Sequence, residues 1–188
     1  MSNIVDIVQS QVIASVKQEK HLDMAIQSNS NIIFLLTGNL MTTKKYIDRL
    51  EENGKTVFVH VDFIEGLANT RSAIQFIAEV WKPKGIITTK NNLIKYAKEE
   101  GLMAIQRVFL IDHNALKKGI EIAHVAKPDA IEVLPGVMPH IIDKLTKLTP
   151  LPIIAGGLIS EKEEIYSGLE AGALAISSVD PKLWNLNL

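Results

Sequence analysis

The chain has 188 residues, of which 20 are Lys or Arg and 21 are Asp or Glu, so its formal net charge at pH 7 is −1. Proteins that bind nucleic acid generally carry a basic excess that neutralises phosphates, so any nucleic-acid surface here has to be a local patch. Cysteine is absent and no apolar run approaches the roughly 18–20 residues of a membrane span, which excludes disulfides, thiolate chemistry and a membrane partner and indicates a cytoplasmic protein.

Eight short runs rich in Ile and Val recur along the chain and are typical of buried strands. They cover residues 12–16, 32–36, 56–63, 85–90, 103–112, 130–134, 152–155 and 173–176. Segments with helical spacing of apolar residues separate them, most clearly at residues 73–81, and a short amphipathic helix is expected within residues 1–11.

This alternation predicts an α/β protein: a compact TIM-like (β/α)8 barrel that forms one domain over residues 1–188. An open, doubly wound sheet is the alternative, and the eight units favour the closed barrel. After Ser178 too few residues remain for a full last helix, so we expect a reduced or missing eighth helix. The N-terminal helix or a partner subunit would then cover the gap.

Small residues end the last two predicted strands. Gly156 and Gly157 follow the seventh, and Ser177 and Ser178 follow the eighth. Glycine lets a ligand approach the backbone closely, and anion sites recur after strands 7 and 8 of such barrels. We therefore predict a phosphate site here; two tight turns without a ligand are the alternative.

Other polar residues lie at or near the predicted strand ends, where barrels bind ligands. His60 and Asp62 share a strand face and with Glu132 could hold a divalent ion, although a buried hydrogen-bonded pair is the interpretation we favour. Lys90 is either a surface lysine at a helix start or a partner for an anion, by ionic contact or as a Schiff base. Arg107 lies in an apolar run and needs a partner, for which Asp62, Glu132 or an anion would serve.

Two further features concern the predicted helices. Asp112 is expected to cap the helix that follows it. Lysine groups on helix exteriors are interpreted as solvated surface, or together as a weak nucleic-acid patch: Lys44-Lys45, Lys82 and Lys84, Lys117-Lys118, and Lys144 and Lys147.

Several segments, taken in this order and spacing, give the chain a family resemblance. They are residues 59–62, 65–67, 85–90, 105–112, 128–136 and 153–159, and the final Leu183-Trp184. Over nearly its whole length the chain resembles the glycerol-3-phosphate-responsive antiterminators, the glycerol uptake operon antiterminator regulatory proteins of bacteria.

The resemblance implies a cytoplasmic transcription regulator with no catalytic activity and no cofactor. It would bind glycerol-3-phosphate as effector and the leader mRNA of glycerol-utilisation genes as target. The backbone and hydroxyls of the small residues Gly156, Gly157, Ser177 and Ser178 would bind the phosphate. Lys90 and Arg107 would be the cations beside it. Asp62 and Glu132 would accept hydrogen bonds from the glycerol hydroxyls.

Two other functions stay open at the level of the sequence. A phosphate-binding barrel enzyme, such as a phosphosugar isomerase, lyase or phosphodiesterase, would need His60, Asp62 and Glu132 to meet a metal or a substrate. A barrel that has lost its ligand would act only through protein contacts. A homo-oligomer is compatible with each of these functions.

Overall fold

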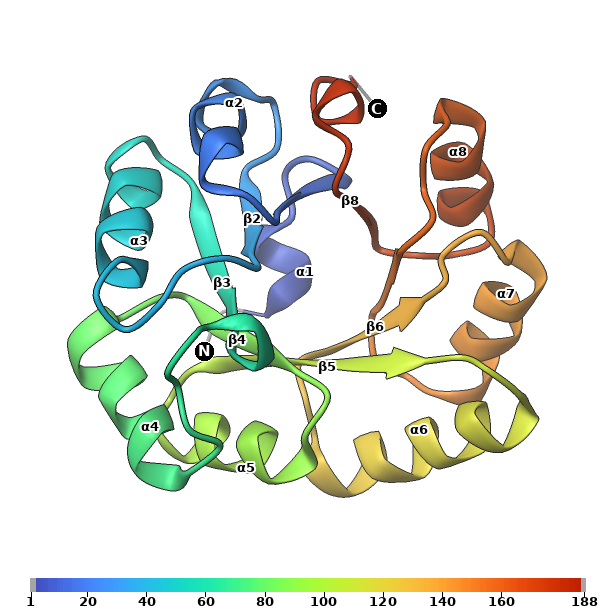
Figure 1. Ribbon diagram of the computed structural model, residues 1–188. Helices are drawn as coiled ribbons and strands as arrows, with labels where there is room; N and C mark the ends of the chain where they lie inside the picture. Colours follow the sequence, from blue (N-terminus) through green and yellow to red (C-terminus); the bar gives the residue numbers. More distant parts are fainter. Residues whose placement is uncertain (1–2, 187–188) are drawn as a thin grey trace.

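Eight parallel strands close into a barrel in the computed structural model, which describes residues 3–186 (Figure 1). Each strand pairs with the next in the chain, and the last pairs with the first. The strands are β1 (Val12–Val16), β2 (Ile32–Leu35), β3 (Thr56–His60), β4 (Gly85–Thr88), β5 (Met103–Phe109), β6 (Ala130–Leu134), β7 (Ile153–Gly156) and β8 (Ala175–Ser178). The predicted (β/α)8 barrel is confirmed. The first two and last two residues of the predicted domain lie outside the described part.

Helices surround the ring of strands (Figure 1). They are α1 (Ile4–Ile7), α2 (Leu22–Gln27), α3 (Thr43–Glu52), α4 (Arg71–Phe76), α5 (Asn91–Glu99), α6 (His113–Ala126), α7 (Pro139–Leu148) and α8 (Lys162–Glu170). Shorter turns are η1 (Glu19–His21), η2 (Val61–Phe63), the π-helical turn η3 (Ile77–Trp81) and η4 (Pro181–Leu183). Helix α1 differs from the others, because its Ile4 packs with side chains inside the barrel.

Several strand boundaries differ from the prediction. Strand β4 ends at Thr88 rather than Lys90, β5 ends at Phe109 rather than Asp112, and two further boundaries change which way polar residues face. Strand β3 ends at His60, and Asp62 lies in the turn η2, so these two residues do not share a strand face. Strand β8 begins two residues later than predicted, because Gly172 takes a left-handed backbone (φ +97°) and extends the preceding turn. Ser177 and Ser178 therefore lie inside β8 rather than after it.

The barrel interior changes from apolar to polar along its axis. An apolar layer of interior side chains includes Phe34, Phe58 and Ile105. Because side chains alternate along a strand, the residue two positions further on faces the same way. On four strands that residue is polar and buried: Phe58 is followed by His60, Ile105 by Arg107, Ala130 by Glu132 and Ala175 by Ser177. The carboxyl end of the barrel is thus a polar mouth above an apolar base.

Between β8 and residue 186 the chain forms no α-helix, so the helix that would follow the last strand is missing, as predicted. This segment forms only the turn η4, after which Trp184 is completely buried and its Nε1 donates a hydrogen bond to the Ser178 carbonyl at 2.8 Å. The Trp184 ring also contacts His21 edge-on, and the Asn29 backbone N–H donates to the Asn185 side chain at 3.1 Å. The tail itself therefore covers the gap, which the sequence had left to the N-terminal helix or a partner.

We expect Trp184→Ala to lower the free energy of unfolding by about 3–5 kcal/mol, because it empties a buried aromatic site. Urea denaturation followed by circular dichroism measures this. Trp184→Phe is the control: it keeps a packed ring, loses the hydrogen bond to Ser178, and should cost much less. An alanine variant as stable as the wild type would contradict a closing role for the tail.

Candidate functional site

A cavity of about 520 Å³ opens at the polar mouth of the barrel. The ends of β1, β5, β6 and β8 and the loop after β7 form most of its wall. Five of the eight residues predicted for the ligand site lie on this wall: Arg107, Glu132, Gly157, Ser177 and Ser178. The structure thus brings the main part of the predicted site together.

A buried ion pair organises the cavity wall. Paired strands β5 and β6 place Arg107 opposite Glu132, and Arg107 Nε donates to Glu132 Oε2 at 2.6 Å. Ser177 Oγ donates to the other carboxylate oxygen at 2.7 Å. The Arg107 side chain is only 6% exposed and that of Glu132 only 1%, so neither charge could be left alone without a large cost. Of the three partners open for Arg107, the structure selects Glu132.

The geometry of this pair leaves part of the guanidinium free. Arg107 uses Nε for Glu132, and its two terminal nitrogens donate no hydrogen bond to any described residue. They belong to a side chain that lines the cavity. A guanidinium held from behind by a carboxylate presents a preorganised fork, a geometry that matches the oxygens of a phosphate.

The two glycines have different roles. A Cβ on Gly156 would lie 2.1 Å from Ser177 Oγ and 3.1 Å from Glu132 Oε1, so glycine is needed there by the ion-pair network. Gly157 lines the cavity with a left-handed backbone (φ +77°), and the next residue, Leu158, is also left-handed (φ +62°). Such a conformation is rare for a bulky residue and is typical of strained segments at functional sites.

Both serine hydroxyls are already engaged with the protein. Ser177 bonds Glu132, as described above, and Ser178 Oγ donates to the Ile159 carbonyl at 3.3 Å and accepts from the Asp180 N–H at 3.1 Å. The two serines therefore line the cavity, and they also shape its wall.

Asp62 and Lys90 form a separate network outside this cavity wall. Asp62 accepts hydrogen bonds from the Thr88 hydroxyl (2.7 Å), from the Thr89 N–H (2.9 Å) and hydroxyl (2.7 Å), and from Lys90 Nζ at 3.2 Å. Burial by itself would raise the pKa of Asp62, but the hydrogen bonds from Thr88 and Thr89 together lower it. Lys90 precedes α5 and is balanced by Asp62, so a bound anion is not needed to explain a cation at that helix start.

His60 is completely buried, and neither ring nitrogen has a hydrogen-bond partner within residues 3–186. The favoured prediction of a His60–Asp62 hydrogen bond is therefore wrong. The Phe63 ring stands edge-on to the imidazole, with centroids 4.6 Å apart. Burial and then the charge of Arg107 lower the pKa of His60 to about 3, against opposing effects of Asp62 and of the residue's own backbone. The imidazole is neutral at physiological pH.

The metal hypothesis fails on this geometry. Asp62 bonds to Thr88, Thr89 and Lys90, whereas Glu132 bonds to Arg107 and Ser177. Within the described part of the chain, no three His, Asp or Glu side chains gather as metal ligands.

The residues that β1 and the end of β2 contribute to the cavity wall were not predicted from the sequence. Ser15, Lys17 and Leu36 line the cavity. Lys17 is exposed and forms no ion pair with any residue that the structure describes. The signal was available, because Ser15 and Lys17 are alternate residues at the end of the first apolar strand, where the other polar candidates were sought.

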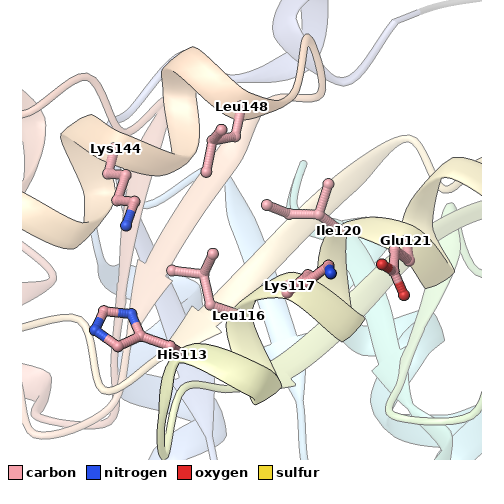
Figure 2. A pocket seen from close by; sticks show the side chains of 7 residues that line it. All are labelled: His113, Leu116, Lys117, Ile120, Glu121, Lys144 and Leu148. Carbon is pink, nitrogen blue, oxygen red and sulfur yellow. The ribbon is translucent and has the colours of Figure 1, made fainter.

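A second hollow of about 570 Å³ lies on the outer face between α6 and α7 (Figure 2). Leu116, Ile120 and Leu148 form its apolar part, and the polar side chains around it are Lys117 and Lys144, together with His113 and Glu121. Two of the predicted lysine groups are therefore on facing helices. Asp112 caps α6 as expected, accepting from the Ala115 N–H at 2.7 Å.

Comparison with known proteins identifies the family. The sequence model of the glycerol-3-phosphate responsive antiterminators matches residues 12–184. The chain belongs to the glycerol-3-phosphate responsive antiterminator family. This confirms the resemblance found in the sequence.

None of the helices within the described residues combines the length and the apolar character of a membrane span.

Three relatives of this antiterminator family member span nearly its whole length. The uncharacterized protein YgcP of Escherichia coli (strain K12) is 37% identical over 182 residues, which cover 95% of this chain and 93% of YgcP. The crystal structure of a glycerol uptake operon antiterminator regulatory protein from Listeria monocytogenes str. 4b F2365 is 32% identical, with a TM-score of 0.90 and coverage of 94% and 95% of the two chains. A glycerol uptake operon antiterminator-related protein from Thermotoga maritima MSB8 is 32% identical, with a TM-score of 0.83 and coverage of 93% and 98%.

The neutral state of His60 predicts a specific pH dependence of stability. The unfolded chain takes up a proton on this imidazole as the pH falls below its ordinary pKa of 6.5, whereas the folded protein does so only near pH 3. Stability from this group is complete above pH 6.5 and falls by at most about 1.4 kcal/mol per pH unit below it.

We therefore expect His60→Phe to gain stability relative to the wild type as the pH falls from 7 to 5, a range in which Asp62 stays ionised. Urea denaturation at several pH values measures the difference. Parallel stability curves for the two proteins would contradict a neutral, buried His60.

Proposed function

We propose that the chain is a transcription antiterminator that binds glycerol-3-phosphate in the mouth cavity and acts on the leader mRNA of glycerol-utilisation genes. The observation that carries the effector half is Arg107. It is fixed by Glu132 and presents two unpaired guanidinium nitrogens in a cavity that Lys17 also lines. A dianionic phosphate monoester fits two cations at this position, and the family is defined by its response to such a ligand.

A regulatory rather than catalytic function is supported by the arrangement of the ionisable groups. An enzyme of the kind considered from the sequence would need His60, Asp62 and Glu132 around one reacting centre. Here the two carboxylates serve different networks, and Glu132 holds Arg107 and Ser177 in place. The mouth is thus built to position cations around a ligand, and we propose no catalytic residue.

We expect isothermal titration calorimetry to detect glycerol-3-phosphate binding, and Lys17→Gln to weaken it about tenfold or more, because a charged hydrogen bond to the phosphate is lost. Lys17 is a better test than Arg107, whose removal would leave Glu132 buried and unpaired.

Lys45→Gln is the matched control, since Lys45 is exposed on the outer helix α3 and does not line the cavity. It should bind glycerol-3-phosphate like the wild type. Absence of heat and of a thermal shift with the wild-type protein at millimolar ligand would refute the effector site.

For the RNA half of the proposal, the groove between α6 and α7 is the best supported surface (Figure 2). The net charge of −1 requires a local patch. Lys44 is paired with Asp48 and Lys147 with Asp143, whereas Lys117 and Lys144 form no ion pair within the described residues and lie on the two sides of the groove. Because α6 follows β5 and α7 follows β6, the groove stands directly outside the strands that carry Arg107 and Glu132.

We expect Lys117→Gln/Lys144→Gln to weaken binding to a glycerol-gene leader RNA and to reduce the slope of log K against log salt by about 1.4–1.8, the value for two lost phosphate contacts. Lys20→Gln/Lys45→Gln, which changes two exposed lysines elsewhere, is the control. Fluorescence anisotropy with and without glycerol-3-phosphate measures both. If the wild type has no affinity for the leader in either state, the RNA half of the proposal is wrong.

A further inference from the structure

His60 is a buried polar side chain without a structural partner. Its exposure is 0%, and neither Nδ1 nor Nε2 has a hydrogen-bond partner in the described residues. Leaving a buried donor or acceptor unpaired is destabilising, so native proteins rarely keep such a group unless it has a role. A phenylalanine or leucine would fill the same interior position without that cost. Neither the Arg107–Glu132–Ser177 network nor the hydrogen bonds around Asp62 include the imidazole.

The position of His60 connects it to the mouth cavity. It lies on the same strand face as Phe58, whose ring packs inside the barrel, so its side chain also points inward. On the neighbouring strand, Leu35 pairs with Val59, which puts the cavity-lining Leu36 beside His60. The charge of Arg107, another wall residue, acts directly on the imidazole. His60 therefore lies just behind the wall, on the side away from β7 and β8.

The chemistry of the carboxylates points the same way. Asp62 already accepts four hydrogen bonds, and Glu132 accepts from Arg107 and Ser177. Asp62 has thus filled the roughly four acceptor sites of a carboxylate, and both oxygens of Glu132 are engaged in holding the wall, its side chain being only 1% exposed. Both had been expected from the family resemblance to recognise hydroxyl groups. A neutral imidazole offers one N–H donor and one nitrogen acceptor, and a hydroxyl can complement either.

We infer that His60 binds the hydroxyl end of the effector and is the residue that distinguishes a glycerol phosphate from other phosphate monoesters. This inference rests on the proposed function, because it takes the phosphate to lie between Arg107 and Lys17. Phe63 is half exposed, and its ring covers the imidazole from a single short turn. The ligand displaces this ring as its hydroxyls reach His60.

The test compares glycerol-3-phosphate with n-propyl phosphate, which has the same carbon chain and charge but no hydroxyls. Isothermal titration calorimetry is run with the wild type, His60→Phe and His60→Gln. We expect the wild type to prefer glycerol-3-phosphate, and His60→Phe to lose about tenfold or more of that affinity while binding propyl phosphate within about twofold of the wild type. His60→Gln, which keeps a donor and an acceptor, should recover part of the preference.

The outcomes separate this inference from the proposed function. If the wild type binds neither phosphate, the proposed effector site is refuted, and so is the role inferred for His60. If the wild type prefers glycerol-3-phosphate and His60→Phe keeps that preference, the site stands and the inference about His60 is overturned. Equal loss of both ligands in His60→Phe would also overturn it, since that result indicates a general disturbance of the mouth.

A second measurement follows ligand binding on the wild-type protein and uses a variant only to assign signals. Ring ¹⁵N chemical shifts of His60 in the wild-type protein report its hydrogen bonding, and comparison with His60→Gln assigns the signals. We expect the shifts to move on addition of glycerol-3-phosphate and to stay nearly constant with propyl phosphate. Unchanged ring shifts in the presence of bound glycerol-3-phosphate would overturn the inference.

Discussion

The buried ion pair between Arg107 and Glu132 is the constraint on which the mouth of this barrel depends. One carboxylate oxygen of Glu132 accepts a hydrogen bond from Arg107 and the other accepts one from Ser177. These bonds connect β5, β6 and β8 at their carboxyl ends. The same pair explains why residue 156 has to be glycine. It also fixes a guanidinium whose terminal nitrogens donate to no described residue, and we propose that these nitrogens bind the anion.

A division of the mouth into two sides follows from this arrangement. On the side of β5 to β8, extended by Lys17 from β1, Arg107 and Lys17 supply cationic donors suited to a phosphate, and the wall carboxylate Glu132 is bound to Arg107 and Ser177. Around β3 and β4, Asp62 and Lys90 are paired with each other, and the buried, neutral His60 keeps both ring nitrogens without a partner among the described residues. A ligand with a phosphate at one end and hydroxyls at the other matches this division, and the family name refers to such a molecule.

The fold could be predicted from the sequence because each strand is a continuous Ile- and Val-rich run, and eight such runs with helices between them have few other solutions. The cavity wall was largely predictable too, since strand ends are recognisable. What could not be predicted was the pairing of charges. Arg107 had three plausible partners, and only the β5–β6 register selects Glu132. The third strand was predicted to end three residues too late, which put Asp62 on the face of His60; in the structure a short turn carries Asp62 to Thr88 instead. Lys17 was overlooked, although it lies at the end of a predicted strand like the other candidate residues.

A crystal structure of the protein with glycerol-3-phosphate tests the central claim most directly. The account predicts the phosphate within hydrogen-bonding distance of the terminal nitrogens of Arg107 and of Lys17 Nζ, with the Arg107–Glu132 pair intact and the hydroxyls turned toward His60. Phosphate bound at Lys90 instead, or ligand in the groove between α6 and α7 with an empty mouth, would contradict it.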